Sequence, residues 1–175
     1  MGGKSVAQVV AGWHDARKRE MAWLKTPRGG LIPAALEREF CSCGIDWKVL
    51  QGSARTLLHT HVAQSFGANI GLSLPSIMDY ASVARALQHG VTHWHVATVD
   101  DLGKVRGYVS FVPTAKFREL ASRDNDSISA LNAGCKDKVE LNRRMREQGL
   151  VRLRVTPMPG FRYLPGVGLF VRKPE

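Results

Sequence analysis

The stretch ARTLLHTHVAQSFGANIGLSLPSIMDY, residues 54–80, predicts a strand, a loop and a helix in succession. Residues 54–62 are rich in β-branched and apolar side chains, which is typical of a buried strand. Small residues and glycines follow, as in a surface loop. Pro75 and Ser76 then open a helix that we expect to end near Gly90. The apolar face of this helix is expected to contain Tyr80, Val83, Ala84 and Leu87.

The segments on either side of this unit continue the alternation of strands and helices. Residues 31–52 indicate a short helix or strand and then another strand. The other predicted strands are 21–27, 92–99, 105–113, 151–155 and 161–171, and the predicted helices are 5–20, 114–123 and one from Ser127 or Ser129 to Gly149. We therefore expect an α/β (α+β) fold in which a mixed sheet is flanked by helices. The expected unit is a single domain over residues 1–175, with a basic helix–strand extension at 128–175.

Composition limits the function classes. The chain has 175 residues, a net charge of +10 and a pI near 10.0. Ten Lys and Arg against four Asp and Glu place much of this charge in residues 136–175, where we expect an acidic protein partner to dock. The region lacks the interleaved aromatic side chains of a single-strand platform, and no known DNA-binding motif appears, which argues against a nucleic-acid partner.

Localisation can also be predicted from composition. The chain has no apolar run that could serve as a signal peptide or a membrane span. Its three cysteines are too few for a disulfide framework, which favours free thiols in a reducing compartment. We therefore expect a cytoplasmic protein with no membrane partner.

The residues best suited to chemistry are His59, His61, Ser76 and Asp79. Residues i and i+2 of a strand project from one face about 6–7 Å apart, so His59 and His61 can bind one metal ion. Asp79, in the first turn of the next helix, offers a third ligand and leaves a fourth tetrahedral position for water, as in catalytic zinc sites.

Each half of this pattern also has an ordinary structural interpretation. A His-x-His pair is common in strands, and Ser76 with Asp79 has the form of a capping box. Their combination, at the end of a buried strand and at the start of the next helix, favours a metal site. A second pair, His93 and His95, has no Ser-x-x-Asp after it, and we interpret it as ordinary strand residues.

The pattern His59-x-His61, spacer, Ser76-x-x-Asp79 resembles the signature of the JAMM, or MPN-plus, zinc metalloproteases. The resemblance covers residues 20–111 and implies an MPN/JAB-like, cytidine-deaminase-like architecture. It also implies that His59, His61 and Asp79 bind Zn²⁺ and that Ser76 helps to hold the tetrahedral intermediate. This chain departs from the family pattern in having Val62 where Pro is common, and in a longer spacer, from Val62 to Pro75.

The family also has an upstream glutamate that acts as general acid and base. Glu20, at the start of the first predicted strand, is our choice for this role. Glu37 and Glu39 lie too few residues before His59 to leave room for the intervening elements, although neither is excluded by sequence alone.

The resemblance implies a zinc metallopeptidase that hydrolyses a peptide or isopeptide bond. The expected partner is a ubiquitin-like protein or its conjugates. One alternative is a JAMM peptidase that acts on a peptide unrelated to ubiquitin. Another is a catalytically inactive MPN-type scaffold for protein binding, which metal content would distinguish from the enzyme.

Overall fold

The computed structural model describes residues 20–25, 31–38, 43–45, 56–62, 73–100, 102–123 and 125–174. A six-stranded mixed sheet, in the order β2-β1-β5-β6-β7-β8, forms its centre. The six strands are β1 (Ala22–Lys25), β2 (Leu31–Pro33), β5 (Thr56–Val62), β6 (His93–Val99), β7 (Val105–Pro113) and β8 (Val151–Pro157). β5 and β6 are parallel, and the other neighbours in the sheet are antiparallel. The predicted mixed α/β sheet is therefore confirmed.

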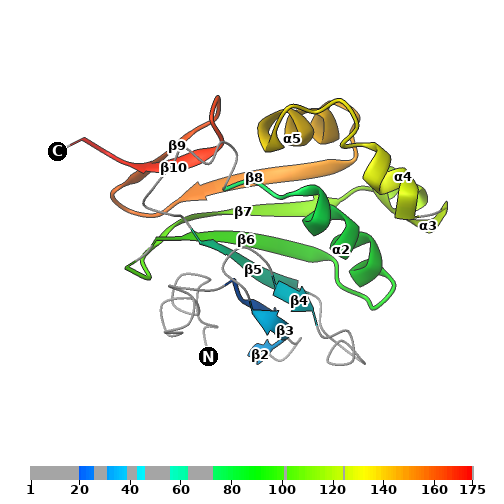
Figure 1. The fold of residues 1–175 in the computed structure, drawn as a ribbon, viewed down its shortest axis with the longest axis horizontal. Coiled ribbons are helices and arrows are strands. Elements are labelled where there is room, and N and C mark those ends of the chain that lie inside the picture. Colours follow the sequence, from blue (N-terminus) through cyan, green and yellow to red (C-terminus); the bar gives the residue numbers. More distant parts are fainter. Residues whose placement is uncertain are drawn as a thin grey trace.

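Four described helices contribute to one core on one face of this sheet. They are α2 (Ile77–Leu87), α3 (Ala115–Arg123), α4 (Asn125–Ala130) and α5 (Lys138–Glu147). Figure 1 shows α2 in front of the central strands and α5 alongside β8. The shared core contains Tyr80 of α2, Phe117 of α3, Ile128 of α4 and Leu141 of α5, all 1% exposed or less. A second cluster contains Trp23 and Leu58. Because side chains alternate along a strand, these residues point to the other face of the sheet.

The predicted helix from Ser127 or Ser129 to Gly149 is wrong, because two helices occupy that region. Turns interrupt the helix between Ala130 and Lys138, and Gly134 adopts a φ of +73°, which an L side chain rarely tolerates. Asp137 then caps a new helix by accepting a hydrogen bond from the backbone nitrogen of Glu140 at 2.9 Å. The predicted helix at 5–20 falls on residues 5–19, which lie outside the described residues.

The described parts of the region 31–52, residues 31–38 and 43–45, contain strands where the sequence left helix and strand open. β3 (Ala35–Arg38) and β4 (Cys43–Ile45) form a separate two-stranded sheet. The single strand predicted at 161–171 is wrong, because a turn at 165–168 divides it into β9 (Phe161–Leu164) and β10 (Leu169–Arg172), which pair as a hairpin. No described helix has the length and apolar character needed to cross a membrane.

The β9–β10 hairpin packs against β7 and supports the segment that leads into α2. A Cβ atom on Gly107 of β7 would lie 2.5 Å from the Phe170 ring, so this close approach requires glycine. The backbone nitrogen of Phe170 donates to Ser73 Oγ at 3.3 Å, and Ser73 N donates to Gly168 O at 3.2 Å. The C-terminal hairpin therefore helps to fix the chain just before Ser76.

A buried asparagine joins α5 to α2. Asn142, which is 2% exposed, accepts a hydrogen bond from the Tyr80 hydroxyl at 2.6 Å. Its amide nitrogen donates to Pro75 O and to Lys138 O, each at 2.8 Å. One side chain therefore connects the start of α5, the residue before the N-cap of α2, and the interior of α2.

Replacing Asn142 by Ala should lower the free energy of unfolding by about 2–3 kcal/mol, because the buried Tyr80 hydroxyl and Pro75 carbonyl lose their partner. Denaturant unfolding measures this loss. Tyr80→Phe serves as the control, since it leaves both amide hydrogen bonds of Asn142 intact and should cost less. Equal losses in the two variants would contradict this account.

His95 of β6 should make stability depend on pH. Burial, with added repulsion from His93 and Lys25, lowers the pKa of His95 to about 4, against an ordinary value near 6.5. Between these values the unfolded chain binds more protons, so stability should rise with pH from about 4 to 6.5, by roughly 1–3 kcal/mol. Thermal unfolding across this range should show the slope, and His95→Gln should flatten it. If stability depends on pH as steeply in the variant as in the wild type, other titrating groups cause the dependence.

Candidate metal centre

Strand β5 supplies two histidines to the face of the sheet that α2 covers. His59 and His61 point to the same face of the sheet as Leu57, because the three residues are spaced by two along β5. Leu57 belongs to the core beneath α2. Their rings lie 5.0 Å apart between centroids and are nearly perpendicular. The strands on either side of β5 bury it, and both imidazoles lie in its carboxyl-terminal half.

Glu20 reaches the same face because of the register between β1 and β5. Ala22 lies opposite His59 in this antiparallel pair. Two backbone contacts continue the pairing to the preceding residue, since Thr60 N donates to Met21 O at 2.9 Å and Met21 N donates to Thr60 Oγ1 at 2.8 Å. Glu20 Oε2 then lies 3.1 Å from His59 Nε2, and Glu20 is buried.

Asp79 comes to the histidines from the first turn of α2. Its Oδ1 lies 2.8 Å from His59 Nδ1, and its Oδ2 lies 3.4 Å from His61 Nε2. Ser76 is the N-cap of α2 and forms the predicted capping box, because its hydroxyl accepts from Asp79 N at 3.2 Å and its backbone nitrogen donates to Asp79 Oδ2 at 2.7 Å. The Ser76 hydroxyl also donates to Asp79 Oδ2 at 2.6 Å. Capping thus positions Asp79.

The structure brings all the predicted site residues together. Glu20, His59 and His61 each offer a ligand atom, and these atoms lie within 4.8 Å of one another, so the group could hold a metal ion. A pair of imidazoles with a carboxylate is a donor set that suits zinc and several transition metals. Asp79 contacts both histidines from the other side. That one carboxylate binds a metal ion and the other acts as an acid–base group stays a prediction.

Carboxylates and imidazoles of the cluster lie in direct contact with one another. Burial raises the pKa of the Asp79 carboxyl, but the neighbouring His61 and His59 outweigh this effect and hold it well below its ordinary value. His59 has a carboxylate oxygen at hydrogen-bond distance from each ring nitrogen, which is the arrangement of an imidazolium that donates twice. A metal ion that binds either ring nitrogen must compete with a proton there, so metal affinity should fall in acid.

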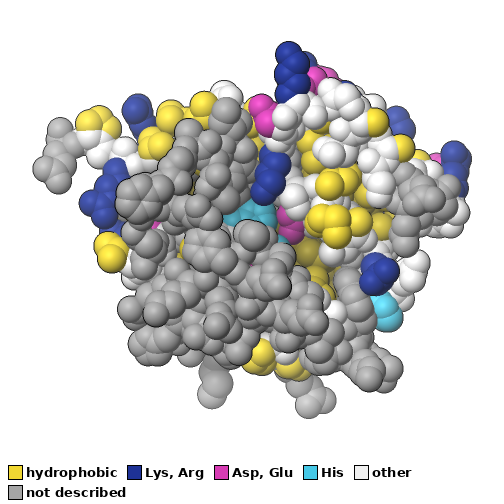
Figure 2. Space-filling view, in the orientation of Figure 1, with side chains coloured by type: hydrophobic (Ala, Val, Ile, Leu, Met, Phe, Trp, Pro, Cys, Tyr) yellow, Lys and Arg dark blue, Asp and Glu magenta, His cyan; other side chains and the backbone are white. Residues whose placement is uncertain are grey.

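The cluster opens to one face of the molecule. The side chain of His59 is 11% exposed, whereas those of His61 and Asp79 are 4% and 3% exposed. Figure 2 shows histidine and acidic atoms in the middle of this face, bordered by basic and hydrophobic side chains. A ligand could therefore approach the imidazole edge without unfolding the site.

Of the three candidate glutamates, Glu20 is the one whose side chain the structure describes. Glu20 contacts His59, whereas Glu37 lies in β3 of the separate two-stranded sheet and Glu39 lies outside the described residues. The second histidine pair is not part of the cluster, because His95 Nδ1 lies 2.7 Å from Ser110 Oγ and His93 Nδ1 lies 2.9 Å from Thr92 Oγ1.

Sequence reasoning missed two residues near the centre. Thr60 helps to fix the register between β1 and β5, which places Glu20 beside His59. Nothing in the local sequence around Thr60 indicates this role. Thr98 lies opposite His61 in the β5–β6 register, and its buried hydroxyl has no hydrogen-bond partner among the described residues. A buried hydroxyl of this kind ordinarily finds a partner, so its position fits a site that receives a further group.

Comparisons with protein-family models, with curated proteins and with solved structures find no match for this chain. The functional interpretation therefore depends on the residues of the site and on their geometry.

Proposed function

We propose that the chain is a zinc-dependent metallopeptidase of JAMM type, with an MPN/JAB-like architecture, which hydrolyses a peptide or isopeptide bond. The observation that carries the proposal is the meeting of Glu20, His59 and His61 in one buried group, with Asp79 against both histidines. These groups come from three separate elements, the start of β1, the strand β5 and the helix α2. A chance cluster of ionisable side chains would cost free energy to bury, so the arrangement favours a function.

The proposed roles follow from the positions of the side chains. His59, His61 and Asp79 would hold Zn²⁺, which supplies a water of lowered pKa and polarises the substrate carbonyl. Glu20 lies beside His59 and would accept the proton of that water, then deliver it to the departing amine. The Ser76 hydroxyl would hydrogen-bond the developing oxyanion, for which it must turn from Asp79 Oδ2.

The proposed substrate is a ubiquitin-like protein or one of its conjugates, in the cytoplasm. The basic C-terminal region supports an acidic protein partner. A pocket of about 450 Å³ between α5 and β8 is lined by Arg143, Arg146 and Arg152 together with Glu147. Arg143 is 3.7 Å from Glu140, which is partly exposed, and 3.7 Å from Glu147, which is exposed. Ion pairs at the surface are weak, so the pocket keeps its basic character.

The purified protein should bind one equivalent of zinc, and His59→Ala or His61→Ala should weaken binding by at least about a hundredfold. Metal analysis after dialysis against a competing chelator measures this. The second histidine pair provides a matched control, since His93→Ala removes an exposed imidazole from a neighbouring strand and should leave zinc content unchanged. Loss of zinc in the control, or retention of zinc in both β5 variants, would show that His59 and His61 do not form the metal site.

Glu20→Gln should retain zinc and lower peptide cleavage by about 10²–10⁴-fold, because it keeps the shape of the side chain and removes the proton acceptor. Zinc content and cleavage of a ubiquitin-like fusion by the same preparation separate two outcomes. If zinc is lost along with activity, Glu20 is a ligand and Asp79 is the candidate acid–base group. If full activity remains, Glu20 has neither role.

A further inference from the structure

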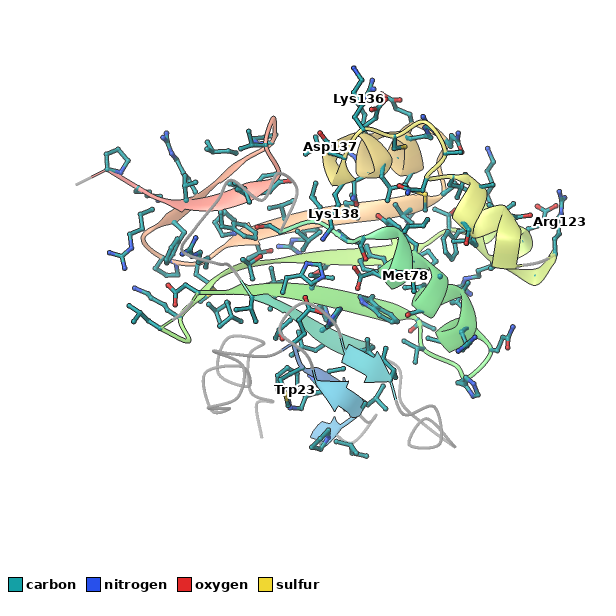
Figure 3. All side chains as sticks on the ribbon, in the orientation of Figure 1. Trp23, Met78, Arg123, Lys136, Asp137 and Lys138 are labelled. Atoms are coloured by element: carbon teal, nitrogen blue, oxygen red, sulfur yellow. The ribbon has the colours of Figure 1, made fainter. Side chains whose placement is uncertain are left out.

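Lys138 is a half-buried cation at the first position of α5 whose ammonium has no assigned function. No described residue forms an ion pair with it, although ion pairs link Arg143 to Glu140 and to Glu147 on the same helix. Figure 3 places Lys138 on the side of α5 that faces the sheet, whereas Lys136 extends away from the molecule. Lys136 is exposed.

The start of α5 is fixed next to the candidate metal centre. The Asn142 amide nitrogen donates both to Lys138 O and to Pro75 O, each at 2.8 Å, and Pro75 directly precedes the N-cap Ser76. Asp79 lies one helical turn beyond. Figure 2 shows a basic side chain beside the histidine and acidic atoms of the site, and Figure 3, in the same orientation, labels Lys138 at that place.

Helix stability does not explain a lysine at this position. The first turn of a helix favours negative charge, and α5 already has Asp137 and Glu140 there. Nor does Asp79 need Lys138 for charge balance, because His59, His61 and Ser76 supply its partners. The cation is therefore available for a group that arrives from outside.

An apolar side chain also lies beside the exposed edge of the candidate metal centre. Met78, in the first turn of α2, is 71% exposed, and Figure 3 shows it on the same face as Lys138. Met78 directly precedes Asp79 and is a flexible apolar side chain that a ligand at the centre can contact. The surface around the candidate metal centre thus carries one positive charge, from Lys138, and one flexible apolar side chain, Met78.

On this basis we infer that Lys138 is a specificity-determining residue which binds a carboxylate of the substrate close to the scissile bond. The inference rests on the proposed function and narrows its substrate class to peptides with an acidic side chain or a free carboxyl group at that position. A lysine ammonium binds such a group as a flexible point charge, and its half-burial reduces screening by solvent.

Hydroxamates that bind zinc and carry a second polar group test this inference without a known substrate. The probes are the monohydroxamic acids of succinic, glutaric and adipic acid, each compared with the matching amide. Calorimetry on the zinc-loaded protein should give a carboxylate probe that binds about tenfold more tightly than its amide. Lys138→Met should abolish that preference, Lys138→Arg should retain most of it, and the matched control Lys136→Met should leave it unchanged.

The outcomes separate this inference from the proposed function. Hydroxamates that bind the wild type with no preference for the carboxylate, or a preference that survives Lys138→Met, would overturn the role of Lys138 and leave the metal centre intact. Failure of every hydroxamate to bind the zinc-loaded protein would contradict the proposed function and this inference together. Loss of the preference in Lys136→Met as well would assign it to the general positive field of the region.

Discussion

The arrangement of this site depends on burying four ionisable side chains in mutual contact. An isolated carboxylate or imidazolium in a protein interior is costly, and it is tolerated when oppositely charged groups and hydrogen bonds surround it. His59 lies between Glu20 and Asp79, and the second oxygen of Asp79 is held by His61 and Ser76. Removing one member leaves its neighbours buried without compensation, so the cluster behaves as a unit.

The same constraint explains why strand register matters so much here. Side chains alternate between the faces of a sheet, and a one-residue slip of β1 along β5 would turn Glu20 toward the cluster that contains Trp23. The contacts between Met21 and Thr60 hold the register at the residue next to Glu20. Apolar packing fixes the strands, and a few polar contacts then decide which face receives the carboxylate.

The sequence predicts the parts of the site whose partners are close along the chain. His59 and His61 share a face because of strand periodicity, and Ser76 with Asp79 forms a capping box within one helical turn. Glu20 was placed by resemblance, and its contact with His59 spans 39 residues. The link that Asn142 makes between α5 and α2 is not predictable from the sequence, because it depends on contacts with Pro75 and Tyr80, which no local pattern encodes. The break at Gly134 was missed because the apolar spacing on both sides fits one helix.

Under the proposed function, metal binding and the charge of Lys138 would be coupled through the formal charges of the cluster. Glu20 and Asp79 bring two negative charges when ionised, and an imidazolium at His59 would offset one of them, while hydrogen bonds from Ser76 stabilise the carboxylate of Asp79. A divalent ion with two neutral imidazoles would compensate both carboxylates, and the ammonium of Lys138 would then border a neutral centre. An anionic group would therefore be attracted more strongly with metal bound. By linkage, such a ligand should in turn tighten the hold of the cluster on its metal ion.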